Sequence, residues 1–162
     1  MEREASAERL FFREMKMPQF SRHVSVDWQG SLMDGNGTAV AGTGAFTLPV
    51  SFARRIGEPQ GVTSPEEMIA AAHAACYAMV IAGAMGRKGI TARKHEVTCT
   101  VTADKGDAGI KIVASKLDVT AEGIDGIDAV GFAAAMKEAE KGCPVSNALR
   151  GSVAIEVDVT VR

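Results

Sequence analysis

Two of the three cysteines stand in contexts where a thiol could do chemistry. Cys76 lies in the run Ala-Ala-His-Ala-Ala-Cys, and Cys143 lies in Gly-Cys-Pro-Val-Ser, 67 residues later. The stretch at Cys143 predicts a helix start, where the positive end of the helix dipole favours a thiolate. The two could form a redox pair. Each also fits a plain structural position: a small buried residue for Cys76 and a capping residue for Cys143.

The third cysteine has a different setting. Cys99 alternates with Val97 and Val101 in a strand-like stretch, so we expect it in the core. Because three is an odd number, a fully paired disulfide scaffold is excluded. The first 20 residues are charged and lack the apolar run of a secretory signal, which predicts a cytoplasmic protein. A cysteine pair in that compartment is reduced, transient or catalytic rather than structural.

Other polar side chains allow other chemistry. His73 and Cys76 are three residues apart on one helical face, and with Cys143 they would make a Cys₂His metal site. The sequence has no CxxC or HxxxH spacing, however, and a helix histidine more often satisfies hydrogen bonds of its own. Glu66 alone is typical of a helix start, and Arg54 and Arg55 alone are typical of a solvated pair. A phosphate loop, a GxSxG elbow and a dinucleotide fingerprint are all missing, so nothing favours nucleotide or serine-hydrolase chemistry.

The element that carries Cys76 is a long helix. Ser64 is the expected N-cap, Pro65 suits the first turn, and Glu67 completes a capping box. The helix is predicted to run to about residue 86, and His73 is the only polar side chain between residues 68 and 85. Such a run could span a membrane, but many of its residues are alanine and alternating strands follow. We therefore expect a central helix buried on all sides rather than a membrane span.

The remaining pattern predicts a sheet against this helix. Strands are expected over 22–31 and 38–48 with a turn at 34–37, and a loop is expected from Pro49 to Thr63. Two further strands follow the helix, with a slip of phase in 109–120 that suggests a bulge. A second helix over 128–141, a short helical turn from Cys143 to Leu149 and a last strand from 153 complete the chain. The fold class is α+β with a mostly antiparallel sheet.

Size and charge exclude several functions. The chain has 162 residues, which suits one compact domain at 17–162 preceded by a peripheral extension at 1–16. A net charge of −2 and an aromatic content of 5% argue against a nucleic-acid partner. The long helix has more apolar surface than one small sheet can cover, and a homodimer would bury the excess.

Two stretches together resemble a known family. The run Ser64-Pro-Glu-Glu-Met-Ile-Ala-Ala-Ala-His-Ala-Ala-Cys76-Tyr, with Gly142-Cys143-Pro-Val-Ser-Asn-Ala-Leu149, is similar to the OsmC/Ohr family of thiol peroxidases, and most similar to its osmotically inducible OsmC branch. The resemblance extends from Trp28 to the C-terminal strand. It implies an intertwined homodimer that reduces organic hydroperoxides, and hydrogen peroxide less well, in oxidative and osmotic stress defence.

The resemblance also assigns residues. Cys76 matches the family's peroxidatic cysteine and Cys143 its resolving cysteine. Glu66, ten residues before Cys76, matches the family glutamate, and Arg55 matches the family arginine, with Arg54 as the alternative. The loop before Glu66 is one residue longer than the family pattern.

The implied reaction needs neither metal nor cofactor. A Cys76 thiolate becomes a sulfenic acid, a Cys76–Cys143 disulfide follows, and an external dithiol of the lipoyl or a similar type restores the thiols. Two alternatives stay open from the residues themselves: a Cys₂His metal-binding module, and a non-catalytic small-molecule-binding module of the same fold.

Overall fold

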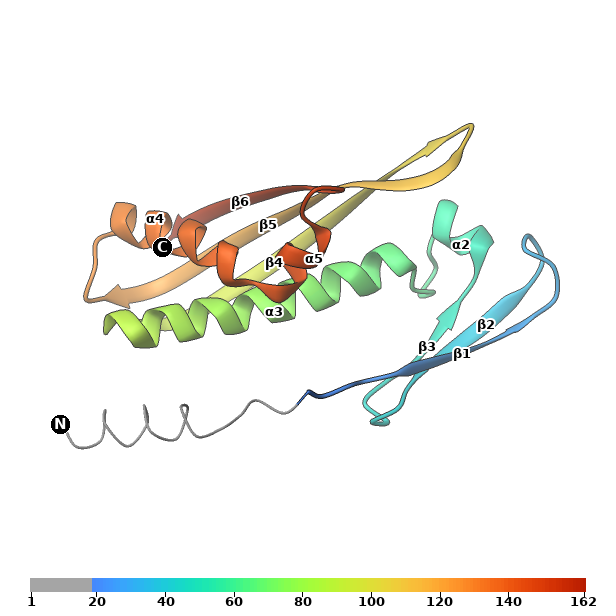
Figure 1. The fold of residues 1–162 in the computed structure, drawn as a ribbon, viewed down its shortest axis with the longest axis horizontal. Helices are drawn as coiled ribbons and strands as arrows, with labels where there is room; N and C mark the ends of the chain where they lie inside the picture. The colour runs from blue at the N-terminus through green and yellow to red at the C-terminus, as the bar shows by residue number, and fades with distance from the viewer. Residues whose placement is uncertain (1–18) are drawn as a thin grey trace. The chain divides into compact units, whose positions relative to one another are not determined.

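The structure is a computed structural model that describes residues 19–162, and it has the expected α+β composition (Figure 1). The extension expected at residues 1–16 lies outside the described residues. The chain divides into two compact units, one ending at Phe52 and the other running from Ala53 to Arg162. Each unit contains one three-stranded sheet.

The first unit is an antiparallel sheet of β1 (Val24–Gln29), β2 (Asn36–Ala41) and β3 (Thr47–Val50), in that order. The single strand expected over 38–48 is wrong, because the chain turns within it. Gly44 donates to the Ala41 carbonyl at 2.8 Å and has a φ of 75°, a conformation that costs glycine little. The glycines of this stretch therefore split the strand into β2 and β3.

The second unit contains a long hairpin and one further strand. β4 (Thr91–Gly106) pairs antiparallel with β5 (Gly109–Asp125), and β6 (Ala154–Val161) pairs parallel with β5. The predicted bulge is confirmed: Thr102 pairs with Ala114 and Ala103 pairs with Ile112, so Val113 has no partner in the register. Of the four strand pairings in the two sheets, three are antiparallel and one is parallel, so the strand pairing is mostly antiparallel, as expected.

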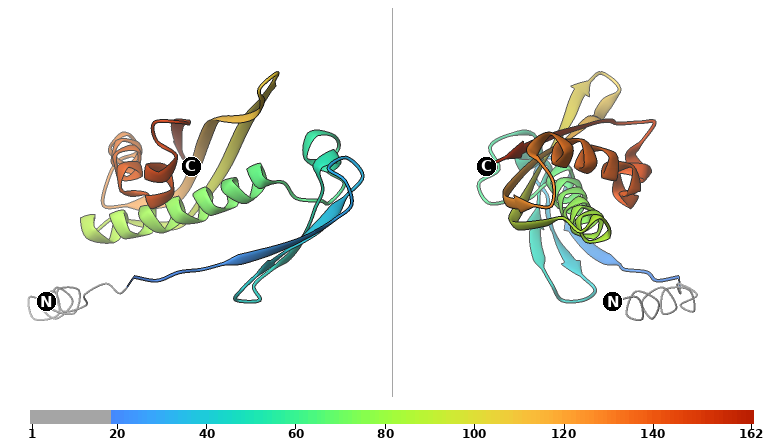
Figure 2. Two further views of the ribbon diagram at one scale, coloured as in Figure 1. Left: turned by 45° about the vertical axis from the view of Figure 1, so that its right-hand side comes forward. Right: turned by 90° about the vertical axis from the view of Figure 1, so that its left-hand side faces the viewer.

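Helices cover one face of this second sheet (Figures 1 and 2). They are α3 (Pro65–Lys88), α4 (Ala129–Ala139) and α5 (Pro144–Leu149), with the 3-10 turn η1 (Glu140–Gly142) between the last two. The core between helices and sheet is apolar. Its fully buried large side chains include Tyr77, Ile81, Leu117, Phe132 and Met136. The parallel placement of β6 forces the chain to cross the sheet after β5, and that crossover brings α5 to α3.

A short helix replaces part of the expected loop. The segment from Pro49 to Thr63 is predicted as a loop, but it contains the end of β3 and α2 (Phe52–Ile56). Five residues make little more than one turn, too short to leave a periodic apolar pattern in the sequence. The helix carries Arg54 and Arg55 in its last turn.

The ends of α3 follow the predicted signals with one difference. The Glu67 amide donates to the Ser64 hydroxyl at 3.1 Å, as an N-cap requires. The Glu67 carboxylate accepts from the Thr63 hydroxyl at 2.7 Å, so the reciprocal half of the capping box uses a neighbouring side chain. The helix is predicted to end at about residue 86 but runs to Lys88, where Gly89, with a φ of 66°, is its C-cap.

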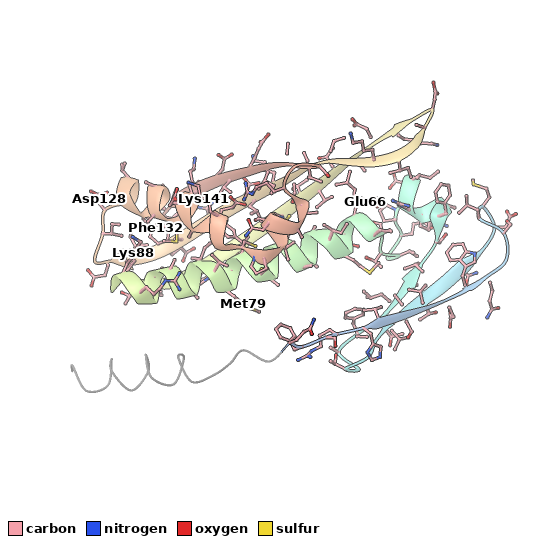
Figure 3. The ribbon with its side chains drawn as sticks, viewed as in Figure 1. Glu66, Met79, Lys88, Asp128, Phe132 and Lys141 are labelled. Carbon is pink, nitrogen blue, oxygen red and sulfur yellow. The ribbon has the colours of Figure 1, made fainter. Side chains whose placement is uncertain are left out.

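The expectation that α3 is buried on all sides is wrong for the single chain. Its buried residues lie on one face: His73, Tyr77, Ile81, Ala84 and Met85. Met79, 74% exposed, lies on the side of α3 away from the sheet (Figure 3). Among the described helices, α3 alone is long and apolar enough to span a membrane by length and composition, a test that the core helices of globular proteins also meet.

Candidate active site

Two elements distant in sequence bring Cys76 and Cys143 into contact. Cys76 lies in the middle of α3, and Cys143 is the N-cap residue of α5. The Cys143 thiol donates to the Cys76 sulfur, with 3.2 Å between the two Sγ atoms. Cys143 is fully buried, whereas Cys76 is partly exposed. The pair can therefore close into a disulfide once Cys76 has been oxidised, because only a small approach of the sulfurs is needed.

The environment of Cys76 acts on its ionisation in two directions. Burial raises the pKa of the Cys76 thiol, and the nearby Cys143 thiol raises it further. A hydrogen bond from the Val145 backbone amide, at the start of α5, lowers the pKa. Within one chain, burial has the largest effect on the pKa of Cys76. A reactive thiolate at neutral pH thus needs an additional positive group near Cys76.

Arg55 and Glu66 form a bidentate pair at the N-terminal end of α3. The Arg55 Nε donates to both carboxylate oxygens at 3.1 Å, and its Nη2 lies 2.5 Å from the Oε1. The hydrogen bond from Arg55 lowers the pKa of Glu66, and the same bond raises the pKa of Arg55. Arg54 instead donates to the Glu58 carbonyl at 3.4 Å. Of the two arginines, Arg55 is the one that Glu66 orients.

The arginine pair and the cysteine pair are separated within one chain. Glu66 precedes Cys76 by ten residues, which is about 15 Å of helix rise. The hydrogen bonds and ion pairs of residues 19–162 include none between Arg55 or Glu66 and Cys76. Figure 3 shows Glu66 at the end of α3 nearest α2.

An open pocket of about 350 Å³ lies beside the arginine pair. Its polar lining comprises Arg54, Arg55, Ser64, Glu66, Glu67 and Thr100. Its apolar wall includes Val62, Ala70 and Val101. Cys99 also contributes to this wall, on the strand face where the sequence predicts it. The mixture of charged and apolar side chains suits a ligand with a small polar group and an apolar tail.

His73 does not join the cysteines. It is fully buried, its Nδ1 lies 2.8 Å from the Ser115 hydroxyl, and its Nε2 lies 2.7 Å from the Ser146 hydroxyl. Both ring nitrogens are therefore engaged, and the Cys₂His alternative loses its third ligand. Across the described part of the chain, no three His, Cys, Asp or Glu side chains gather as a metal site requires.

Sequence reasoning missed the polar groups around this histidine. Ser115 lies on the inward face of β5, in phase with Leu117 and Val119, and it also lies 3.3 Å from the Cys99 sulfur. A serine at an inward strand position needs a buried partner, and this was the available signal. Glu140, nearly buried, accepts two hydrogen bonds from Arg150 at 2.8 and 3.0 Å. Nothing in the spacing of these residues indicates that pair.

Comparison with known proteins assigns the class of the fold first. The structure matches that of an organic hydroperoxide resistance protein OsmC from Legionella pneumophila with a TM-score of 0.70 at 24% identity, over 88% of this chain and all of the other. An organic hydroperoxide resistance protein from Elizabethkingia anophelis matches with a TM-score of 0.71 at 20% identity, over 90% of this chain and 99% of that one. At this identity the matches establish the fold, which is the predicted one.

The sequence then gives the family. The model of the family described as OsmC-like protein matches residues 57–158. The peroxiredoxin OsmC of Escherichia coli strain K12 is 36% identical over 132 residues, 80% of this chain and 90% of that protein. The chain belongs to the OsmC-like family. The organic hydroperoxide resistance protein-like 2 of Staphylococcus saprophyticus is 34% identical over 105 residues, 62% of this chain and 71% of its own length. These relatives agree with the predicted enzyme class, a thiol peroxidase.

Proposed function

We propose that this protein is a two-cysteine peroxidase that reduces organic hydroperoxides, and hydrogen peroxide less well, to the corresponding alcohols or water. The observation that supports it most strongly is the 3.2 Å contact between a partly exposed and a fully buried cysteine sulfur. Two relatives named for organic hydroperoxide resistance and peroxiredoxin activity support the same reaction. A reducing cytoplasm, in a cell under oxidative or osmotic stress, suits a pair that must return to thiols.

The first step is an oxygen transfer to Cys76. Its thiol releases a proton to water, and the thiolate attacks the terminal oxygen of the hydroperoxide. The oxygen–oxygen bond breaks, the alkoxide leaves and takes a proton, and Cys76 becomes a sulfenic acid. The sulfur is oxidised by two electrons and the peroxide is reduced to an alcohol.

The second and third steps restore the enzyme. The Cys143 sulfur attacks the Cys76 sulfenic sulfur, a disulfide forms, and water leaves with the sulfenic oxygen and the thiol proton. An external dithiol, of the lipoyl or a similar type, then exchanges with this disulfide, becomes oxidised itself and returns both cysteines to thiols. No metal or cofactor takes part in any of these steps.

The role of Arg55 requires a second copy of the chain. An arginine beside Cys76 would favour the thiolate, but about 15 Å of helix rise separates Cys76 from the Arg55–Glu66 pair of its own chain. We therefore propose a homodimer in which the pair of one protomer faces Cys76 of the other. Glu66 would orient the guanidinium, and the exposed side of α3 would lie in the interface.

The arginine can be tested by the reactivity of Cys76. Arg55→Met should shift the pH profile of Cys76 alkylation by iodoacetamide to higher pH, because burial alone raises the pKa of this thiol. Arg54→Met is the matched control and should leave the profile in place. Coincident profiles for Arg55→Met and the unaltered protein would remove Arg55 from the site.

The reaction itself is tested by stoichiometry. Reduced, metal-free protein is mixed with one equivalent of cumene hydroperoxide, and its cysteines are mapped by mass spectrometry. A rapid Cys76–Cys143 disulfide with Cys99 still a thiol is the expected result. Three unreacted thiols in folded protein would leave the chain with the fold of the family but without the proposed activity.

A further inference from the structure

A network of buried polar side chains lies in the core beside the cysteine pair. It links Cys99, Ser115, His73 and Ser146 by contacts of 3.3, 2.8 and 2.7 Å, and three of the four are fully buried or nearly so. Burial of polar groups in a dry core is unfavourable unless they are hydrogen-bonded, so the contacts within this network are needed for the fold. None of its members takes part in the proposed reaction.

The histidine joins the two elements that carry the reacting sulfurs. His73 lies one helical turn before Cys76 on α3, and Ser146 lies one turn after Cys143 on α5. Among the described residues, the His73–Ser146 bond is the one hydrogen bond between two side chains that joins α3 and α5, other than the contact of the sulfurs themselves. The Val145 backbone amide also donates to the Cys76 sulfur. Because Ser146 and Cys143 lie on the same helical turn, a movement of α5 that displaces Ser146 also displaces Cys143 relative to Cys76.

The position of α5 depends on hydrogen bonds to neighbouring elements. α5 contains six residues, too few to be stable as an isolated helix. Two further side-chain anchors hold it to the preceding turn, from Arg150 to Glu140 and from Asn147 to the Lys141 carbonyl at 3.1 Å. These bonds fix α5 to its own neighbour in sequence. They do not fix it to α3.

We propose that His73 is a positioning residue that holds Ser146, and with it the N-terminal turn of α5, so that Cys143 stays within reach of Cys76 for disulfide closure. This inference rests on the proposed peroxidase function and adds to it a step-specific role for the histidine. The partner it acts on is the resolving cysteine of the same chain, through the backbone of α5.

The chemistry of the ring fits a positioning role. A neutral imidazole has one donor and one acceptor nitrogen, and a serine hydroxyl can meet either one, so both hydrogen bonds form in either tautomer. Burial lowers the pKa of His73, while the Glu140 carboxylate acts in the opposite direction. With both nitrogens occupied by serines, the ring has no free position from which to exchange a proton with Cys76 or Cys143.

Disulfide formation should change the hydrogen bonding of His73. The two sulfurs, 3.2 Å apart in the thiol form, must approach to about 2.05 Å in a disulfide. An approach of Cys143 toward Cys76 would move the N-terminal turn of α5, which also carries Ser146. The hydrogen bond from this serine to the His73 Nε2 should therefore change its length or angle when the enzyme is oxidised.

Ser146→Ala tests the proposal, and Ser115→Ala is its matched control. Each removes one buried hydroxyl from the same imidazole, but only Ser146 lies on α5. Rapid mixing with cumene hydroperoxide, with dimedone trapping at set times, separates formation of the sulfenic acid from its loss to the disulfide. We expect Ser146→Ala to slow the loss roughly three- to tenfold, as removal of one hydrogen bond would, and to change the formation rate less than twofold.

The control separates positioning from general stability. Ser115→Ala should lose a similar amount of stability to urea and should slow disulfide closure less than twofold. Equal slowing in both variants, or closure in Ser146→Ala as fast as in the unaltered protein, would overturn the positioning role. If the unaltered protein forms no sulfenic acid at all, it is the proposed function that fails.

A spectroscopic measurement tests the same link without a substitution. The protein has three histidines, so ¹⁵N-labelled imidazoles give few signals. Oxidation should shift the Nε2 resonance of His73 and leave those of His23 and His95 in place. A His73 resonance that is the same in the thiol and disulfide forms would contradict the proposal.

Discussion

Burial gives the two cysteines of the candidate site different access to small molecules. The Cys143 side chain is fully buried, and the Cys76 side chain is not. A hydroperoxide therefore reaches Cys76 first, and Cys143 reacts with the product formed there.

This order predicts different defects for the two cysteines. Cys76→Ser should abolish peroxide turnover, whereas Cys143→Ser should complete one oxidation and stop at a sulfenic acid. Peroxide consumption with an excess dithiol, and dimedone adducts found by mass spectrometry, measure the two effects. Cys99→Ser is the control and should retain turnover. Full multiple turnover in Cys76→Ser would sink the mechanism.

The Arg55–Glu66 pair makes a pH-dependent contribution to stability. The arginine lowers the pKa of Glu66 below its ordinary value of 4.5, so the ionised carboxylate stabilises the fold above about that pH. The contribution is lost as the pH falls from 4.5 through the lowered folded-state pKa. Glu66→Gln should therefore cost about 1–2 kcal/mol at neutral pH and progressively less in acid.

Urea unfolding at several pH values measures this difference. The control is Glu58→Gln, which removes an exposed carboxylate that has no ion pair among the described residues. A stability difference for Glu66→Gln that is the same at pH 3 and pH 7 would show that the ionised pair is not its source.

At the scale of elements, the cap of α3 supports both ends of the candidate site, since the helix carries Glu66 in its first turn and Cys76 in its middle. Ser64→Ala removes the hydroxyl that accepts from the Glu67 amide and should cost about 1 kcal/mol of stability. Thermal or urea unfolding measures the cost. Ser152→Ala, at an exposed turn position, is the control and should change stability by a few tenths of a kcal/mol or less. An equal loss in both variants would mean that the cap does not stabilise α3.

The signals that predicted elements correctly are local ones. Ser64 and Pro65 mark the start of α3 through backbone geometry that depends on few neighbours, and the phase slip in 109–120 marks the bulge. The split of 38–48 and the short helix α2 were missed. In both places glycines or a single helical turn interrupt a pattern too briefly to change its period.

The candidate site was predictable to the extent that its residues lie in motifs. Cys76 and Cys143 stand in recognisable stretches, so their pairing could be anticipated from the family resemblance. The buried partners of His73 could not, because Ser115 and Ser146 are 42 and 73 residues from it and become neighbours only through the sheet and the crossover. Contacts of that kind depend on the complete fold.

At the scale of the whole molecule, the exposed side of α3 is the feature that a single chain leaves unexplained. Met79→Glu places a charge on that side and should convert the proposed dimer into monomers with much reduced peroxidase activity. Sedimentation velocity measures the state of assembly, and circular dichroism shows whether the fold is kept. Val130→Glu, at an 80% exposed apolar position on α4, is the matched control and should leave assembly unchanged. A Met79→Glu protein that is still dimeric and active would exclude this side of α3 as the interface.

The contact between the two cysteines also joins points 67 residues apart along the chain. A disulfide there would close a loop of that length and restrict the conformational entropy of the unfolded chain, which should make the oxidised form more stable by about 4 kcal/mol. Urea unfolding of the two redox forms measures the difference, and equal midpoints would contradict it. The oxidised enzyme, rather than the reduced enzyme that is ready to react, would then be the form that best resists unfolding under the conditions that produced the peroxide.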